Sequence, residues 1–101
     1  MPITSIVTFV KPPEVQFFHE ISEENLALGK SIADWSRTQP GFISVSSAMV
    51  DSNTRTLTYV FDTVENYNAW LVNRRKQASF LTINEYYVIN KIVGTVKETI
   101  S

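Results

Sequence analysis

The hydrophobic and polar residues of the first half of the chain alternate in patterns that predict a strand, a helix and a second strand. β-Branched residues and phenylalanine over residues 3–10 predict a strand, which two prolines then end. Apolar residues at helical spacing predict a helix over about residues 22–38 that begins at a serine N-cap. The pair Pro40-Gly41 breaks this helix, and alternation over residues 42–50 predicts the second strand.

The second half of the chain repeats the order of strand and helix. A polar turn leads to a third strand over residues 55–61, so the second and third strands are expected to form a hairpin. Asp62 or Thr63 is expected to cap a second helix, because both side chains can accept a hydrogen bond from the first turn. This helix ends in the cations Arg74-Arg75-Lys76, which suit the negative end of the helix dipole.

Three segments have less regular patterns. Residues 14–21 fit an extra helical turn before the first helix or a loop, and residues 77–84 fit a short helix or a loop. Residues 86–100 are rich in β-branched and aromatic side chains and predict a long final strand, bent at Gly94.

The predicted elements follow the order β-α-β-β-α-β, which is that of the ferredoxin-like fold, an α+β class with an antiparallel sheet. Two helices on one face would leave the other face of the sheet bare. Because each predicted strand carries apolar residues on both sides, we expect two copies to pack their sheets together as a homodimer. The length predicts one domain, residues 1–101, and the long last strand could reach the partner copy.

Composition and charge exclude several classes of function. The net charge is −1, without the basic field that collects nucleic acid, so no nucleic-acid partner is expected. The absence of cysteine excludes disulfides, thiolate metal sites and a cysteine nucleophile, and a single histidine is too solitary for a metal site. No apolar run approaches the ~20 residues that span a bilayer, and the N-terminus lacks signal-peptide features. We therefore expect no membrane association and a cytoplasmic location.

Two segments resemble the antibiotic-biosynthesis-monooxygenase-like domains of the dimeric α+β barrel superfamily. Residues 39–43, Gln-Pro-Gly-Phe-Ile, resemble the Pro-Gly-Phe start of the family's second strand. Residues 59–70 resemble its third strand, the acidic or Ser/Thr cap and the Trp-bearing helix. The resemblance implies a dimeric α+β barrel and a monooxygenase-like activity on a planar aromatic or quinol-like compound. It also implies that neither metal nor flavin is needed, so no cofactor is expected.

The same resemblance makes haem binding or haem degradation a weaker alternative. Haem-degrading members use a helix Trp, a His about ten residues after it and an Asn on the first strand. Trp70 matches the helix Trp, but Phe80 stands near the position of the His, and residues 3–10 contain no Asn.

Several residues are candidates for a site inside the barrel. His19 is the only imidazole and is a candidate general base, while Trp70 would shield or orient a planar substrate. The candidate substrate-binding residues place rings, hydroxyls and an amide in a mostly apolar pocket; they are Tyr59, Phe61, Asn66, Trp70, Phe80 and Tyr87.

Each candidate also has a structural interpretation. Trp70 suits a helix core, His19 suits a surface or capping position, and Arg74-Arg75-Lys76 suits a solvated helix end rather than an anion contact. A non-catalytic domain of the same fold, which binds a small apolar ligand or serves assembly, is therefore the alternative to an enzyme.

Overall fold

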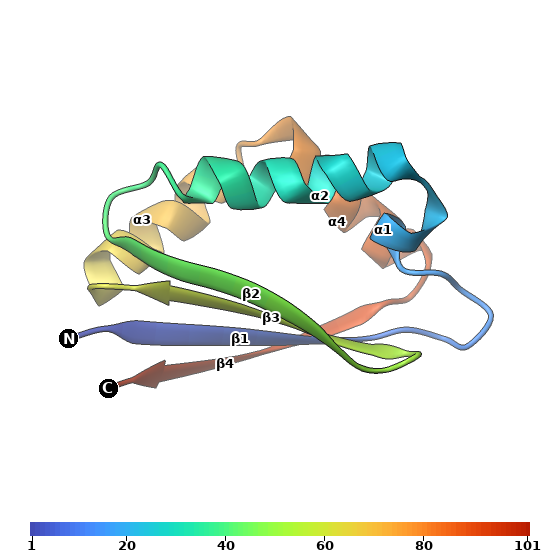
Figure 1. The fold of residues 1–101 in the computed structure, drawn as a ribbon, viewed down its shortest axis with the longest axis horizontal. Helices are drawn as coiled ribbons and strands as arrows, with labels where there is room; N and C mark the ends of the chain where they lie inside the picture. The colour runs from blue at the N-terminus through green and yellow to red at the C-terminus, as the bar shows by residue number, and fades with distance from the viewer.

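Four antiparallel strands form one sheet, and all four helices lie on the same face of it (Figure 1). The computed structural model describes residues 1–101. Along the chain the elements are β1 (Ile3–Val10), α1 (Phe18–Ile21), α2 (Glu23–Ser36), β2 (Phe42–Asp51), β3 (Thr54–Phe61), α3 (Val64–Arg74), α4 (Ala78–Ile89) and β4 (Val93–Ile100). The strand order β2-β3-β1-β4 confirms the predicted ferredoxin-like arrangement.

The start and end of α2 are set by local sequence as predicted. The Ser22 hydroxyl accepts a 3.1 Å hydrogen bond from the Asn25 N–H and caps the helix. Beyond its end, Gly41 has φ +80°, a conformation that side chains rarely adopt. A Cβ at Gly41 would also collide with the Asp62 carboxylate, so the turn into β2 requires glycine.

The beginning of α3 settles which residue caps it. The Thr63 hydroxyl accepts a 3.1 Å hydrogen bond from the Asn66 N–H, so Thr63 is the N-cap. The Asp62 carboxylate instead accepts a 2.9 Å bond from the side-chain amide of Asn66, beside Gly41. Both side chains therefore fix the junction of β2, β3 and α3.

The prediction of one strand over residues 86–100 is wrong in its first part, because α4 continues to Ile89 and β4 begins only at Val93. β-Branched and aromatic side chains favour a strand locally, but tertiary packing overrides that preference. The residues of α4 that line the cavity recur at helical spacing; they are Phe80, Ile83, Asn84, Tyr87 and Val88. The segment before α2 holds the extra helical turn, α1.

The end of α4 has no glycine to mark it in the sequence. Lys91 adopts the left-handed conformation, with φ +58°. Its N–H donates to the carbonyl of Val88 at 3.3 Å, and the Ile92 N–H donates to that of Tyr87 at 2.9 Å. This pair of bonds is the Schellman motif that commonly ends helices. From Val93 onward β4 pairs with β1 without a register shift, and the missing side chain of Gly94 leaves room for the ring of Phe9.

The most tightly packed part of the interior lies between the sheet and α3. Its buried cluster consists of Ile3, Tyr59, Phe61, Tyr67 and Trp70, which we call the α3 core. The Tyr67 hydroxyl donates to the Ser5 hydroxyl at 3.1 Å, so a polar group that enters this core has a partner. Aromatic rings supply most of its buried area.

The opposite face of the sheet carries no helix (Figure 1). Because side chains alternate along a strand, this open face is formed by the residues that lie between the helix-facing ones. On the three strands β1, β3 and β4 they are Thr4, Ile6, Thr8, Val10, Thr54, Thr56, Thr58, Val60, Val93, Thr95, Lys97 and Thr99. The face therefore mixes threonine with a few apolar residues. None of the helices has the length and apolar character that crossing a membrane requires.

Candidate functional site

A cavity of about 530 Å³ lies between the helices and the sheet, next to the α3 core. Its walls come from the middle of β2, from the ends of β1 and β3 nearest the β2–β3 turn, from the start of β4, from α1, α2 and α4, and from the last residue of α3. Fifteen of its 25 lining residues are hydrophobic, and its volume falls within the range of small-molecule sites. The cavity is open to solvent, and its exposed lining residues include Asn84 and Val88 of α4, Lys30 of α2 and Ser47 of β2.

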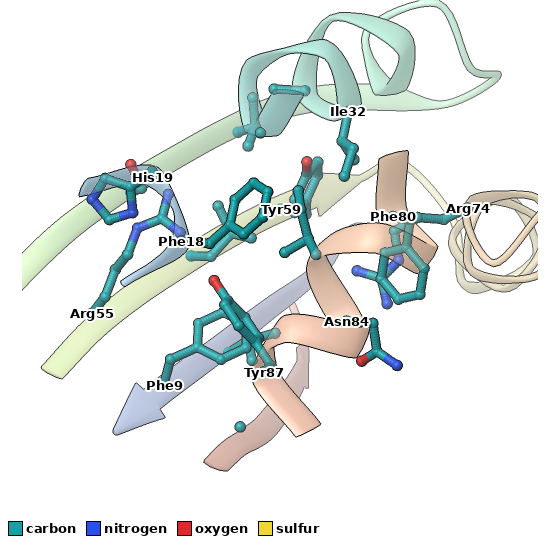
Figure 2. A pocket seen from close by; sticks show the side chains of 18 of the residues that line it. Phe9, Phe18, His19, Ile32, Arg55, Tyr59, Arg74, Phe80, Asn84 and Tyr87 are labelled. Carbon is teal, nitrogen blue, oxygen red and sulfur yellow. The ribbon is translucent and has the colours of Figure 1, made fainter. Parts of the chain in front are cut away.

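Polar side chains gather at two ends of this cavity, with rings and aliphatic groups between them (Figure 2). His19 from α1 and Arg55 from β3 lie together at one end. Arg74 from the last turn of α3 lies at the other end, with Asn84 of α4 nearby. The side chains between the two ends are Phe9, Phe18, Ile32, Tyr59 and Tyr87.

His19 presents a neutral imidazole to the cavity. Burial lowers the pKa of His19 below its ordinary value of 6.5, the positive charge of Arg55 lowers it further, and Glu20 opposes both. Its Nδ1 atom is buried and has no hydrogen-bond partner. The ring stacks on Phe17 with centroids 5.9 Å apart. Because Nδ1 is shielded, the part of this neutral ring that lines the cavity is the part that can accept a proton from a bound molecule.

Two tyrosines supply hydroxyl groups to the apolar middle. Tyr87 packs edge-on against Phe9, with centroids 4.9 Å apart, and Tyr59 lies 4.4 Å from the ring of Trp70. Burial raises the pKa of the Tyr87 phenol, although the nearby Arg55 acts to lower it. Burial likewise raises the pKa of Tyr59, although a hydrogen bond with Ser36 and the charges of nearby arginines act to lower it. Both phenols are therefore protonated at neutral pH and can donate hydrogen bonds.

Arg74 lies between two aromatic rings. Its guanidinium carbon is 4.7 Å from the centroid of Trp70 and 4.5 Å from that of Phe80, which gives cation–π contact on both. Its Nε atom is buried without a hydrogen-bond partner. Burial lowers the pKa of Arg74, but arginine remains charged in proteins. The expectation of a solvated helix end thus describes Arg75 and Lys76, which are exposed, and is wrong for Arg74.

The structure brings together four of the predicted site residues and leaves three outside the cavity. His19, Tyr59, Phe80 and Tyr87 line it. Trp70 and Phe61 are buried in the α3 core, and Asn66 is bound to Asp62 at the junction with β2. Trp70 reaches the cavity only through its contacts with Arg74 and Tyr59.

The sequence interpretation missed Phe18, Arg55, Arg74 and Asn84 as lining residues. Arg55 shares the inner face of β3 with Leu57 and Tyr59, so strand alternation was a usable signal for it. Asn84 was missed because residues 77–84 were predicted only as a short helix or a loop, and the helix that contains Asn84 continues to Ile89.

No family model matches the sequence, and no curated protein matches it. Solved structures do match over nearly the whole chain. SnoaB, a cofactor-independent oxygenase from Streptomyces nogalater, aligns with a TM-score of 0.69 and 14% identity, over 99% of this chain and 92% of that one. A candidate antibiotic biosynthesis monooxygenase from Deinococcus radiodurans aligns with a TM-score of 0.69 and 12% identity, over 98% and 91% of the two chains.

A candidate monooxygenase from Shewanella loihica gives a TM-score of 0.64 at 14% identity, over 99% and 93%. The chain therefore has the fold of the antibiotic-biosynthesis-monooxygenase-like domains, as the sequence resemblance implied.

Proposed function

We propose that this protein is a cofactor-independent oxygenase that acts on a planar aromatic, quinol-like compound bound in the cavity. The observation that carries this proposal is the apolar cavity with an unpartnered, neutral imidazole at one end. Phe9, Phe18 and Tyr87 offer ring surfaces of the kind that hold a flat molecule. The shared fold with SnoaB, which is a cofactor-independent oxygenase, adds support.

In this proposal His19 is the general base. It takes the proton of a phenol or of a methylene carbon conjugated with it, and the guanidinium of Arg55 stabilises the resulting oxyanion. Tyr59 and Tyr87 orient the substrate oxygens by hydrogen bonding. Trp70 acts as a positioning residue, because it contacts Tyr59 and Arg74 but does not line the cavity.

The substrate itself supplies the electrons. Its carbanion transfers one electron to O₂, the two radicals combine to form a carbon–oxygen bond, and the peroxide then loses water. A methylene group thereby becomes a ketone, with one O₂ consumed and one water formed. The carbon loses four electrons and the two oxygen atoms gain them, so no external reductant is required.

We also propose that the functional unit is a homodimer in which two copies pack their open faces. The central residues of this face, Ile6 and Thr58, are uncharged, and Lys97 is its only cation on β1, β3 and β4. Sedimentation at micromolar concentration should give the mass of two chains. Thr58→Arg should give single chains, because dimerisation would bury the new arginine of each chain in the interface between the two sheets. A wild-type chain that sediments as a stable monomer would overturn this proposal.

Oxygen uptake with a panel of hydroquinones and polyketide-like phenols tests the oxygenase. The wild-type protein should consume one O₂ per substrate, and His19→Gln should lose most of this rate, since general bases contribute about 10²–10⁴-fold. The exposed variant Arg75→Gln is the control and should keep the rate. Absence of uptake across the panel would contradict the enzyme proposal.

A non-catalytic ligand-binding domain is the second candidate. The observation that favours it is that no carboxylate or carbonyl orients the imidazole of His19, whose Nδ1 has no partner. Saturable binding of the same compounds without oxygen uptake would be the expected result for such a domain.

A further inference from the structure

The charge of the cavity wall differs in sign from that of the whole chain. The chain has a net charge of −1 and ten acidic residues, yet none of these ten lines the cavity. Every charged side chain in the wall is basic; they are Lys30, Arg37, Arg55 and Arg74. A concave surface of one sign concentrates ligands of the opposite sign, so the cavity favours anions.

The four cations do not contribute equally. Lys30 and Arg37 are exposed at the rim, and Arg37 already forms an ion pair with Asp34 at 2.7 Å. Arg55 lies beside His19 and acts on the phenol of Tyr87. Arg74 has no carboxylate partner: the rings of Trp70 and Phe80 contact its guanidinium, and the nearby phenols of Tyr59 and Tyr67 stay protonated and carry no charge to balance it.

Arg74 is also held in place. Trp70 and Phe80 contact its guanidinium, and the Trp70 indole is itself fixed by a 2.9 Å bond to the Ser36 hydroxyl. A half-buried guanidinium without a counter-ion is costly, and because Nε is shielded, its two terminal nitrogens are the donors open to a ligand. A planar carboxylate matches the fork of donors that a fixed guanidinium presents at its edge.

Building on the proposed function, we infer that the ligand is a planar aromatic compound that carries a carboxylate, and that Arg74 binds this carboxylate at the end of the cavity opposite His19. The phenol or carbon that reacts then lies at the His19 end. The exposed residue Asn84 of α4 lies at the same end of the cavity as Arg74. The two polar ends thus fix the direction in which the ring system enters.

Calorimetric titration with two probes of equal shape tests this inference. Anthraquinone-2-carboxylate should bind the wild-type protein at least about tenfold more tightly than the neutral anthraquinone-2-carboxamide, as expected for one charge-assisted pair. Arg74→Met, which keeps the packing between the rings, should remove this preference and leave the carboxamide affinity within about twofold. Arg74→Lys should keep part of the preference, and Arg75→Gln, which removes the neighbouring exposed charge, should keep all of it.

Equal affinity of the wild-type protein for the two probes, or no binding of either, would overturn the inference without any variant. An equal loss of both affinities in Arg74→Met would also overturn it, because the residue would then act only through packing. These measurements need no turnover. A preference for the carboxylate without oxygen uptake would therefore contradict the oxygenase proposal and support the carboxylate site. Oxygen uptake without this preference would support the oxygenase and contradict the carboxylate site.

Discussion

The indole nitrogen of Trp70 donates a 2.9 Å hydrogen bond to the hydroxyl of Ser36, and the two side chains are only 2% and 0% exposed. The Ser36 hydroxyl in turn donates a 2.7 Å hydrogen bond to the carbonyl of Ile32. This chain of bonds joins α3 to α2 between the α3 core and the cavity. It also fixes the ring against which Arg74 lies.

Ser36→Ala should lower the free energy of unfolding by about 1–3 kcal/mol, because it leaves a buried indole N–H without an acceptor. Urea unfolding measures the effect. Ser31→Ala is the matched control, since Ser31 also bonds a carbonyl of α2, that of Leu28, but is exposed. The control should change stability by less than about 0.5 kcal/mol. Equal effects of the two variants would contradict a structural role for the Trp70–Ser36 bond.

The glycines offer a second matched pair. Gly41→Ala should destabilise by about 1–2 kcal/mol from backbone strain alone, and by more because its Cβ would meet Asp62. Gly29→Ala should stabilise by about 0.5–1 kcal/mol, because Gly29 lies inside α2 with nothing within 4 Å of an added Cβ. Thermal unfolding of both variants checks these opposite signs. A loss of stability in the Gly29 variant would show that the space beside it is not free.

Much of the fold follows from local signals in the sequence. The Ser22 cap, the break at Gly41 and the hairpin of β2 and β3 were all predictable, because each depends on residues that are neighbours in the chain. The end of α4 was not, because Lys91 takes the left-handed position where glycine usually stands. Strand-forming side chains near Tyr87 are helical because that spacing turns them to the cavity.

The site was less predictable than the fold. His19, Tyr59, Phe80 and Tyr87 were singled out for their chemistry, and the structure places them around one cavity. The inward turn of Arg74 was not foreseeable, because three consecutive cations at a helix end give no sign of which one points inside. That information lies in the relative positions of α3 and α4, which sequence periodicity does not give.

The single histidine makes an NMR titration simple to assign. The pKa of His19 should lie below 6.5, because burial and Arg55 both favour the neutral imidazole. Arg55→Gln should raise this pKa, and Glu20→Gln should lower it further, since Glu20 opposes the other two effects. A wild-type pKa at or above 6.5 would contradict the buried, neutral state proposed for the base.

The same shift predicts how stability changes with pH. A folded-state pKa below the unfolded value means that the unfolded chain binds more protons between the two. The contribution of His19 to stability is therefore complete above pH 6.5 and is lost as the pH falls through the folded pKa. Urea unfolding between pH 7 and pH 5 should show this loss, and His19→Gln should flatten the curve. A loss of the same size in His19→Gln would assign it to other groups.

Replacing Lys91 by glycine should stabilise the protein by about 1 kcal/mol, because glycine adopts the left-handed conformation without the cost that other residues incur. The matched variant Lys97→Gly lies in the extended strand β4 and should destabilise by about 0.5–1 kcal/mol. Thermal unfolding distinguishes the two. A destabilised Lys91→Gly protein would indicate that the lysine side chain contributes contacts of its own.

The separation of the α3 core from the cavity has a consequence for how such a protein can change over evolutionary time. Packing is densest around Phe61 and Trp70, at one end of the sheet, while the ligand space lies toward the other. Substitutions at wall positions such as Ile32 or Ile83 alter the shape of the space without removing a member of the buried cluster. New substrates can therefore be acquired one side chain at a time, at little cost to folding. Arg74 and Tyr59 lie at the boundary between core and cavity, so a substitution there would affect both packing and ligand binding.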